Sequence, residues 1–240
     1  MNREDLYHLR LTTPGNIHEH LPTLRAFSRG VVVEIGTNEA VSTTGLLAGQ
    51  PDSLTTWDLN PSPNAEDLRQ HAGRTAYDVR QGDSRYIDIG QCDVLFIDSL
   101  HTREQLDIEL RRHAPDVTES ILLHDTTIYG ERGEDGGQGL LVAIREFLRD
   151  SPGWRQVAHW PNCNGLTLLR RVGYGVDLCL SDPRLCLDPG QLGVIVRLQK
   201  RAVSVARHGT QRHDQKRGQA AHNTSNRLHS HTPELFAPRQ

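Results

Sequence analysis

Acidic and histidine side chains follow several apolar segments of this chain, at points where buried strands are expected to end. Asp98 comes directly after Val-Leu-Phe-Ile, with His101 three residues later, and Ser-Ile-Leu-Leu is followed by His124 and Asp125. Two neighbouring carboxylates can bind Mg²⁺, which prefers oxygen ligands, and a nearby histidine can accept a proton as a general base. Because a bound divalent cation lowers the pKa of a hydroxyl group, these residues predict metal-assisted activation of a hydroxyl.

A second segment whose residues could bind a ligand lies near the N-terminus. Three β-branched residues lead into Glu34, and Gly36 follows just before a helical pattern that begins at residue 41. This order predicts a buried parallel strand that ends at a ligand crevice, where a glycine allows the backbone to approach a bound molecule. An acid at the strand end suits a ligand with hydroxyl groups better than it suits a bare phosphate.

Strand and helix patterns alternate along most of the chain. Strands are predicted at residues 31–35, 53–58, 75–81, 93–98, 120–123, 154–160 and 165–170, and helices at residues 17–28, 41–48, 64–72, 102–113 and 140–149. Such alternation predicts a parallel sheet with right-handed crossovers, whereas the last two strands lack an intervening helix. We therefore expect an α/β fold, a Rossmann-like three-layer sandwich whose mostly parallel seven-stranded sheet has an antiparallel last strand.

Each of the first five predicted strands ends near an acid: Glu34, Asp58, Asp83, Asp98 and Asp125. In an open α/β sheet the carboxyl ends of parallel strands share one edge, where ligands bind. Several carboxylates at one edge repel one another unless cations or hydroxyl groups compensate. The arrangement therefore predicts a bound partner at this edge.

The order of these acids resembles the motifs of the class I S-adenosylmethionine-dependent methyltransferases. Glu34-x-Gly36 looks like their first motif, and Glu-Ile-Gly-Thr-x-x-x-Val-Ser-Thr is similar to a subgroup of small-molecule and sugar O-methyltransferases. The resemblance covers roughly residues 17–171 and implies S-adenosylmethionine as the cofactor. It places the methionine part of the cofactor near the first motif, the ribose on Asp58 and the adenine on the motif Gly82-Asp83-Ser84. The implied cofactor-binding residues are Glu34, Gly36, Thr37, Ser42, Asp58, Asp83 and Ser84.

The second cluster is similar to that of metal-dependent sugar O-methyltransferases of macrolide biosynthesis, which have an Asp-x-x-His pair and a later pair of acids. By position, the resemblance implies that Asp98, Asp125 and His124 bind the metal and that His101 is the catalytic base. His124 stands where those enzymes have a carboxylate, and imidazole is a poorer ligand for Mg²⁺. Two alternatives follow: His124 points away from the metal, or the site favours Mn²⁺ or another transition metal. The implied reaction is methylation of a hydroxyl on a small molecule, a sugar or a secondary metabolite.

Two departures and several alternatives stay open at this point. Asn38 and Ala40 stand at the later glycine positions of the first motif, although asparagine tolerates a left-handed backbone. Asp58 lies 22 residues after Gly36, as in NAD-binding proteins, but the three-glycine loop is missing and Glu39 would oppose phosphates. The remaining alternatives are a metal-independent methyltransferase on another acceptor and a non-catalytic cofactor-binding module.

Composition divides the 240 residues into three expected parts. Residues 1–172 are expected to form the methyltransferase domain and residues 173–200 an extension packed on it. Residues 201–240 carry seven Arg and Lys against two acids, a balance of +5 in a chain of net charge −3, and are expected to be a disordered basic tail. The acidic body, at about −8, gives no support for nucleic-acid binding.

The remaining expectations concern location and access. Residues 1–16 are polar and contain Pro14, so we expect no signal peptide, and no apolar stretch predicts a membrane span. The four cysteines form no Cys-x-x-Cys pair, which favours a reduced cytoplasmic protein. A small-molecule acceptor is the expected partner, and a homo-oligomer stays an open alternative. The glycine-rich loop at 130–139 is expected to be either a lid over the substrate or a disordered connector, with Tyr129 and Arg132 as the expected substrate contacts of a lid.

Overall fold

The computed structural model describes residues 1–173. Its helices, in chain order, are α1 (Arg3–Thr12), α2 (Leu21–Phe27), α3 (Val41–Ala48), α4 (Pro63–Asp67), α5 (Arg103–His113) and α6 (Leu140–Asp150). Short 3₁₀ turns are η1 (His18–His20), η2 (Leu68–His71) and η3 (Ala114–Asp116). The strands are β1 (Val31–Ile35), β2 (Ser53–Asp58), β3 (Ala76–Gln81), β4 (Cys92–Ile97), β5 (Val117–His124), β6 (Trp154–Trp160) and β7 (Leu166–Arg171).

Within these residues one seven-stranded sheet runs in the order β3-β2-β1-β4-β5-β7-β6. The pairs from β3 through to β5 are parallel, and β7 is antiparallel to both β5 and β6. The strand order reverses between β1 and β4, which is where open α/β sheets form their ligand crevice. The predicted fold class, including the antiparallel last strand, is confirmed.

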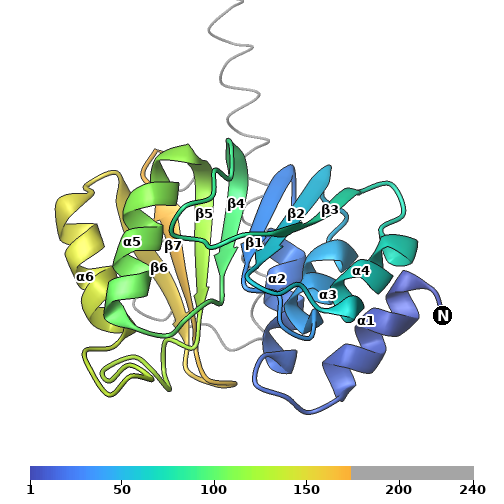
Figure 1. The fold of residues 1–240 in the computed structure, drawn as a ribbon, viewed down its shortest axis with the longest axis horizontal. Helices are drawn as coiled ribbons and strands as arrows, with labels where there is room; N and C mark the ends of the chain where they lie inside the picture. The colour runs from blue at the N-terminus through green and yellow to red at the C-terminus, as the bar shows by residue number, and fades with distance from the viewer. Residues whose placement is uncertain (174–240) are drawn as a thin grey trace, which may run out of the picture. The chain divides into compact units, whose positions relative to one another are not determined.

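The two faces of the sheet bury different apolar sets because side chains alternate along a strand. Val32 and Val94 belong to one core, with residues of α1, α2, α3 and α4. Val33 and Leu95 belong to the other core, with residues of α5 and α6. Figure 1 shows the corresponding grouping of α5 and α6 with β5, β6 and β7, and of α1 to α4 with β1, β2 and β3. The sheet is therefore the middle of three layers.

Local signals explain where several elements begin. Thr102 caps α5 by accepting a hydrogen bond from the Gln105 amide at 3.2 Å, as the Thr-x-x-Gln pattern indicates. Pro22 lies in the first turn of α2, where its missing N–H costs no helical hydrogen bond. The predicted helix over 17–28 is thus a 3₁₀ turn followed by a short α-helix.

No helix or strand was predicted for residues 1–16, yet α1 forms there over Arg3–Thr12. Asn2 caps this helix by accepting a hydrogen bond from the Asp5 amide at 2.9 Å, and Tyr7 is buried in the first core. The helix has few apolar residues, so its packing against α3 stabilises it more than its own periodicity does. No helix in residues 1–173 has the length and apolar character needed to cross a membrane. The expected extension, from residue 174 on, and the expected tail over 201–240 lie outside the described residues.

Candidate functional site

The turn after β1 touches the turn after β4. Gly36 has a φ of +84°, and a Cβ atom there would lie 2.0 Å from the carbonyl oxygen of Asp98. A side chain at this position would therefore overlap with the backbone of the neighbouring turn. The two segments that the sequence singled out for chemistry are thus neighbours at the point where the strand order reverses.

The Asp58 carboxylate organises the turn that contains Gly36. Its Oδ2 atom accepts hydrogen bonds from the backbone amides of Thr37 at 2.8 Å and Asn38 at 3.1 Å. Its Oδ1 atom accepts one from the Asn60 amide at 2.8 Å. A carboxylate held by backbone amides has a fixed orientation and keeps lone pairs for a ligand's hydroxyl groups.

Asn38 and Ala40, at the later glycine positions of the first motif, adopt the left-handed backbone conformation that glycine usually adopts there. Asn38 has a φ of +42° and Ala40 a φ of +58°, both in the left-handed region. The tight turn therefore forms without these glycines, as the tolerance of asparagine suggested. Ala40 is the N-cap residue of α3, and it offers no side-chain hydrogen bond to the first N–H groups of this helix.

Glu34 is buried at the end of β1, beneath this turn. Its carboxylate accepts hydrogen bonds from the hydroxyls of Ser42 at 2.5 Å and Thr43 at 2.7 Å, in the first turn of α3. Burial raises the pKa of Glu34 to about 7, and the hydroxyl hydrogen bonds only partly oppose that rise. Glu34 and Ser42, both expected near the cofactor, are therefore bonded to each other, and Thr37 is bonded through its hydroxyl to Thr56.

Glu34→Gln is expected to change how stability depends on pH. The folded protein holds the Glu34 proton up to about pH 7, while the unfolded chain releases it near 4.5, so wild-type stability falls as pH rises through this window. The variant lacks this loss, and its free energy of unfolding relative to wild type is expected to rise by about 3 kcal/mol from pH 4.5 to 8. Urea denaturation across this range measures it. A difference that does not change with pH would contradict the buried, protonated carboxyl.

The residues expected to meet the adenine lie at the end of β3 and divide into two environments. Asp83 forms an ion pair with Arg85 at 2.6 Å, and its side chain is partly exposed. Ser84 is buried and donates a hydrogen bond to Glu109 of α5 at 2.6 Å. The Ser84 hydroxyl thus points toward α5, while Asp83 is the one of the two that faces solvent.

We call the side of the sheet where the parallel strands have their carboxyl ends the rim. Asp98, His101 and Asp125 form a cluster at the rim, after β4 and β5. The Nε2 atom of His101 lies 2.8 Å from Oδ2 of Asp125 and 3.3 Å from Oδ1 of Asp98. Hydrogen bonds from His101 and His124 lower the pKa of Asp98 to about 2, although burial alone would raise it. Among the described residues the buried Oδ1 atom of Asp125 accepts no hydrogen bond. The carboxylates of Asp98 and Asp125 therefore both face the His101 imidazole.

His101 is held from three sides. Glu134, in the loop after β5, lies 3.1 Å from its Nδ1 atom, and Tyr129 stacks on its ring at 4.8 Å between centroids. Burial would lower the pKa of His101, but the Asp125 and Asp98 carboxylates raise it to about 11. The imidazolium therefore stands where a divalent cation bound to both carboxylates would supply the same positive charge.

His124 lies directly behind this cluster and is fully buried. Its Nδ1 atom lies 3.2 Å from Asp98 and 3.3 Å from Asp125, and its Nε2 atom lies 3.0 Å from the carbonyl oxygen of Cys163. Because a carbonyl oxygen accepts, Nε2 donates its proton there, and the ring is fixed between backbone and carboxylates. In this arrangement His124 supports the two carboxylates from behind, and its role as a metal ligand stays a prediction.

The glycine-rich loop is folded onto the cluster. The Glu134 amide donates to the His101 carbonyl at 3.1 Å, and the Arg103 amide donates to the Gln138 carbonyl at 3.1 Å. Arg132, expected to contact substrate, donates instead to the carbonyl of Gly136 within the loop. The loop is thus attached to the residues around His101.

Sequence reasoning missed two acids that belong to these clusters. Glu134 reaches His101 across 33 positions, and only its place in the loop after β5 hinted at it. Glu109 is buried in α5 with a raised pKa caused by burial, and it accepts hydrogen bonds from Ser84, Ser99 and Gln105. An acid in an amphipathic helix is normally solvated, so its pattern gave no signal.

No protein-family model matches the chain, and no curated protein matches it in sequence. Among solved structures, the SAH-bound methyltransferase PaMTH1 of Podospora anserina is 14% identical at a TM-score of 0.50, covering 70% of this chain and 87% of that one. The N-methyltransferase NodS of Bradyrhizobium japonicum WM9, in complex with S-adenosyl-L-homocysteine, is 13% identical at a TM-score of 0.50, covering 72% and 100%. The mitomycin 7-O-methyltransferase MmcR is 20% identical at a TM-score of 0.48; the match covers 65% of this chain and about half, 54%, of that protein. The chain has the fold of the class I methyltransferases, as its motifs predicted.

Proposed function

We propose that residues 1–172 form an S-adenosylmethionine-dependent O-methyltransferase domain that acts on a hydroxyl of a small molecule, a sugar or a secondary metabolite. The observation that carries this proposal is the contact between the Gly36 turn and the backbone of Asp98. Because of this contact, the expected cofactor crevice lies beside the cluster of Asp98, His101 and Asp125. A methyl donor in the crevice would thus face the groups that can activate an acceptor.

The cofactor would occupy the crevice at the ends of β1 and β2. Asp58, fixed by the amides of Thr37 and Asn38, is suited to the ribose hydroxyls, and Asp83 is the exposed acid on the adenine side. Bound S-adenosylmethionine supplies an electrophilic methyl group. The chain's own contribution is to align the acceptor oxygen with that methyl group and to remove the hydroxyl proton.

The donor set at Asp98 and Asp125 fits a divalent cation. One ligand atom from each of Asp98, His101 and Asp125 lies within 4.8 Å of the other two, and carboxylate oxygens are ligands that Mg²⁺ and Mn²⁺ prefer. When bound there, Mg²⁺ or Mn²⁺ would take over the charge that His101 now supplies and would lower the pKa of a substrate hydroxyl. His101, aligned by Glu134 and Tyr129, is then the residue in place to accept the hydroxyl proton at Nε2.

Asp58→Ala is expected to lower the affinity for S-adenosyl-L-homocysteine about 10- to 100-fold. The variant loses charge-assisted hydrogen bonds to the ribose and leaves the Thr37 and Asn38 amides without their acceptor. Titration calorimetry measures the affinity. Asp88→Ala is the matched control, because Asp88 also accepts a backbone hydrogen bond, from Gly90 at 2.9 Å, in the loop that leads to β4. Equal affinity in wild type and Asp58→Ala would contradict the ribose assignment.

The metal has its own test, which also separates the two alternatives. A chelator is expected to abolish methyl transfer, and added Mg²⁺ or Mn²⁺ is expected to restore it. Transfer that persists in chelator would indicate a metal-independent methyltransferase. Cofactor binding without transfer to any of a panel of hydroxylated acceptors would favour a non-catalytic binding module.

A further inference from the structure

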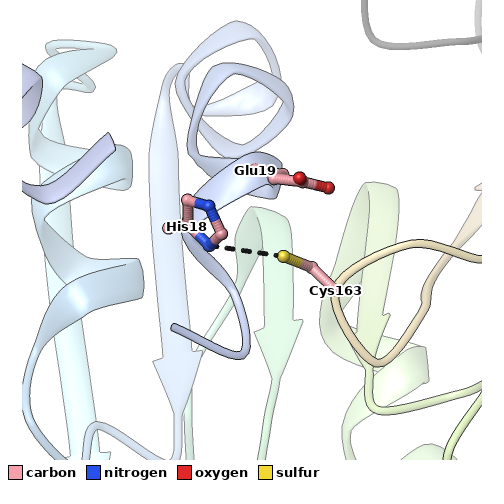
Figure 2. Close-up of side chains that lie close together, drawn as sticks. All are labelled: His18, Glu19 and Cys163. Carbon is pink, nitrogen blue, oxygen red and sulfur yellow. Dashed lines mark hydrogen bonds between the residues drawn. The ribbon is translucent and has the colours of Figure 1, made fainter. Parts of the chain in front are cut away.

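Three side chains with different donor atoms lie close together outside the cluster of Asp98, His101 and Asp125. His18 and Glu19 belong to the turn η1 before α2, and Cys163 belongs to the turn between β6 and β7 (Figure 2). One ligand atom from each of the three lies within 4.8 Å of the other two. A nitrogen, an oxygen and a sulfur donor are thus gathered from segments 145 residues apart in the sequence.

The spacing of these atoms suits a tetrahedral metal ion. The Nδ1 atom of His18 lies 3.4 Å from the Sγ atom of Cys163. Zinc bound at about 2.3 Å from sulfur and about 2.0 Å from nitrogen separates two tetrahedral ligands by about 3.5 Å. The Asn162 side chain holds the Glu19 carboxylate by donating a hydrogen bond to it at 2.5 Å. The separation of these two atoms therefore matches that of two zinc ligands, and Asn162 orients the third ligand. The Nδ1 atom of His18 also lies 2.8 Å from the Gly15 carbonyl oxygen, and a bound metal would replace this contact.

We propose that His18, Glu19 and Cys163 form a Zn²⁺ site, separate from the carboxylate pair of the proposed active site. Thiolate and imidazole ligands select a borderline-soft ion such as Zn²⁺, whereas the two aspartates favour Mg²⁺ or Mn²⁺. On binding, the Cys163 thiol releases its proton to solvent and the thiolate forms the bond to the metal. Three protein ligands leave a fourth position for water.

The site would fasten together two segments that hold His124. The Nε2 atom of His124 lies 3.2 Å from the Asn16 carbonyl oxygen and 3.0 Å from that of Cys163. Asn16 precedes His18 by two residues and Cys163 is itself a proposed ligand, so each carbonyl belongs to one of the two ligand segments. A metal bridge between the segments would fix both acceptors, and through His124 the position of the Asp98 carboxylate.

Cobalt titration of the full chain tests this proposal. With Mg²⁺ in excess, one equivalent of Co²⁺ is expected to give a thiolate-to-cobalt absorption band in the near ultraviolet, and Zn²⁺ is expected to displace it. Cys163→Ser is expected to abolish the band, and Glu19→Gln, at an exposed position, to weaken Co²⁺ binding at least about 10-fold. Circular dichroism verifies that both variants fold.

Matched controls identify the thiolate that is responsible. Asp98→Asn, Cys92→Ser and a variant with both Cys179 and Cys186 replaced by serine are expected to keep the band. A band that survives Cys163→Ser, or that disappears in the double variant, would overturn the assignment. The absence of any thiolate-to-cobalt band in wild type would also overturn it, because a thiol–imidazole hydrogen bond alone explains the 3.4 Å separation.

Discussion

Asp98→Asn is expected to lower the rate of methyl transfer about 10³-fold, which corresponds to about 4 kcal/mol of transition-state stabilisation. The change keeps the shape of the side chain but removes the charge that faces both His101 and His124. An amide is a poor ligand for a divalent cation and no longer orients His101. Steady-state kinetics at saturating S-adenosylmethionine measures the effect, with calorimetry to show that cofactor affinity is retained.

A matched control lies at the other end of β4, the strand that Asp98 follows. Asp93, at the start of β4, accepts hydrogen bonds from the Val31 amide at 2.9 Å and from Thr118 at 2.8 Å. Asp93→Asn therefore makes the same chemical change away from the rim, and its rate is expected to equal that of wild type. Comparable rate losses in both variants would assign the effect to stability and not to the rim.

Gly36→Ala is expected to destabilise the fold by about 3 kcal/mol or more and to abolish measurable cofactor binding. The new methyl group would lie 2.0 Å from the Asp98 carbonyl oxygen, and the backbone would keep a φ of +84° that alanine rarely adopts. Relief requires the turns after β1 and β4 to separate, which opens the crevice. Urea denaturation and calorimetry with S-adenosyl-L-homocysteine measure the two effects.

Gly90→Ala separates the contact from the backbone strain. Gly90 has a φ of +64°, and a Cβ atom there meets nothing within 4 Å. This variant is expected to lose only about 1 kcal/mol and to bind the cofactor as wild type does. Equal losses at both positions would show that the approach of Gly36 to Asp98 is unimportant.

The sheet and its rim could be predicted because they follow from local patterns. Apolar runs ending at Asp98 and Asp125 predict buried strands, and parallel neighbours necessarily present their carboxyl ends at one edge. The register between β4 and β5 brings Ile97 opposite Leu123, so Asp98 comes level with His124 and Asp125 follows one residue later. Helix α1 was missed because its few apolar residues gain their value only from packing on α3.

The directions and partners of side chains could not be read in the same way. Ser84 turns toward α5 because Glu109 is buried there, and that burial depends on the packing of the helix against the sheet. Glu134 reaches His101 only because the loop after β5 folds back over the rim. Cys163 and His18 lie close together although they are 145 residues apart, and no periodicity in the sequence connects their two segments. Such contacts depend on how distant segments pack against one another, which local sequence patterns do not determine.

The most direct test of the central claim is transfer of a labelled methyl group from S-adenosylmethionine to a panel of sugars and hydroxylated small molecules, with and without Mn²⁺. The proposed site predicts an O-methylated product formed in equal amount with S-adenosyl-L-homocysteine, lost in chelator and in Asp98→Asn and retained in Asp93→Asn. Transfer that is unaffected by chelator and by Asp98→Asn would contradict the metal-assisted rim. Failure to bind S-adenosyl-L-homocysteine at all would contradict the crevice itself.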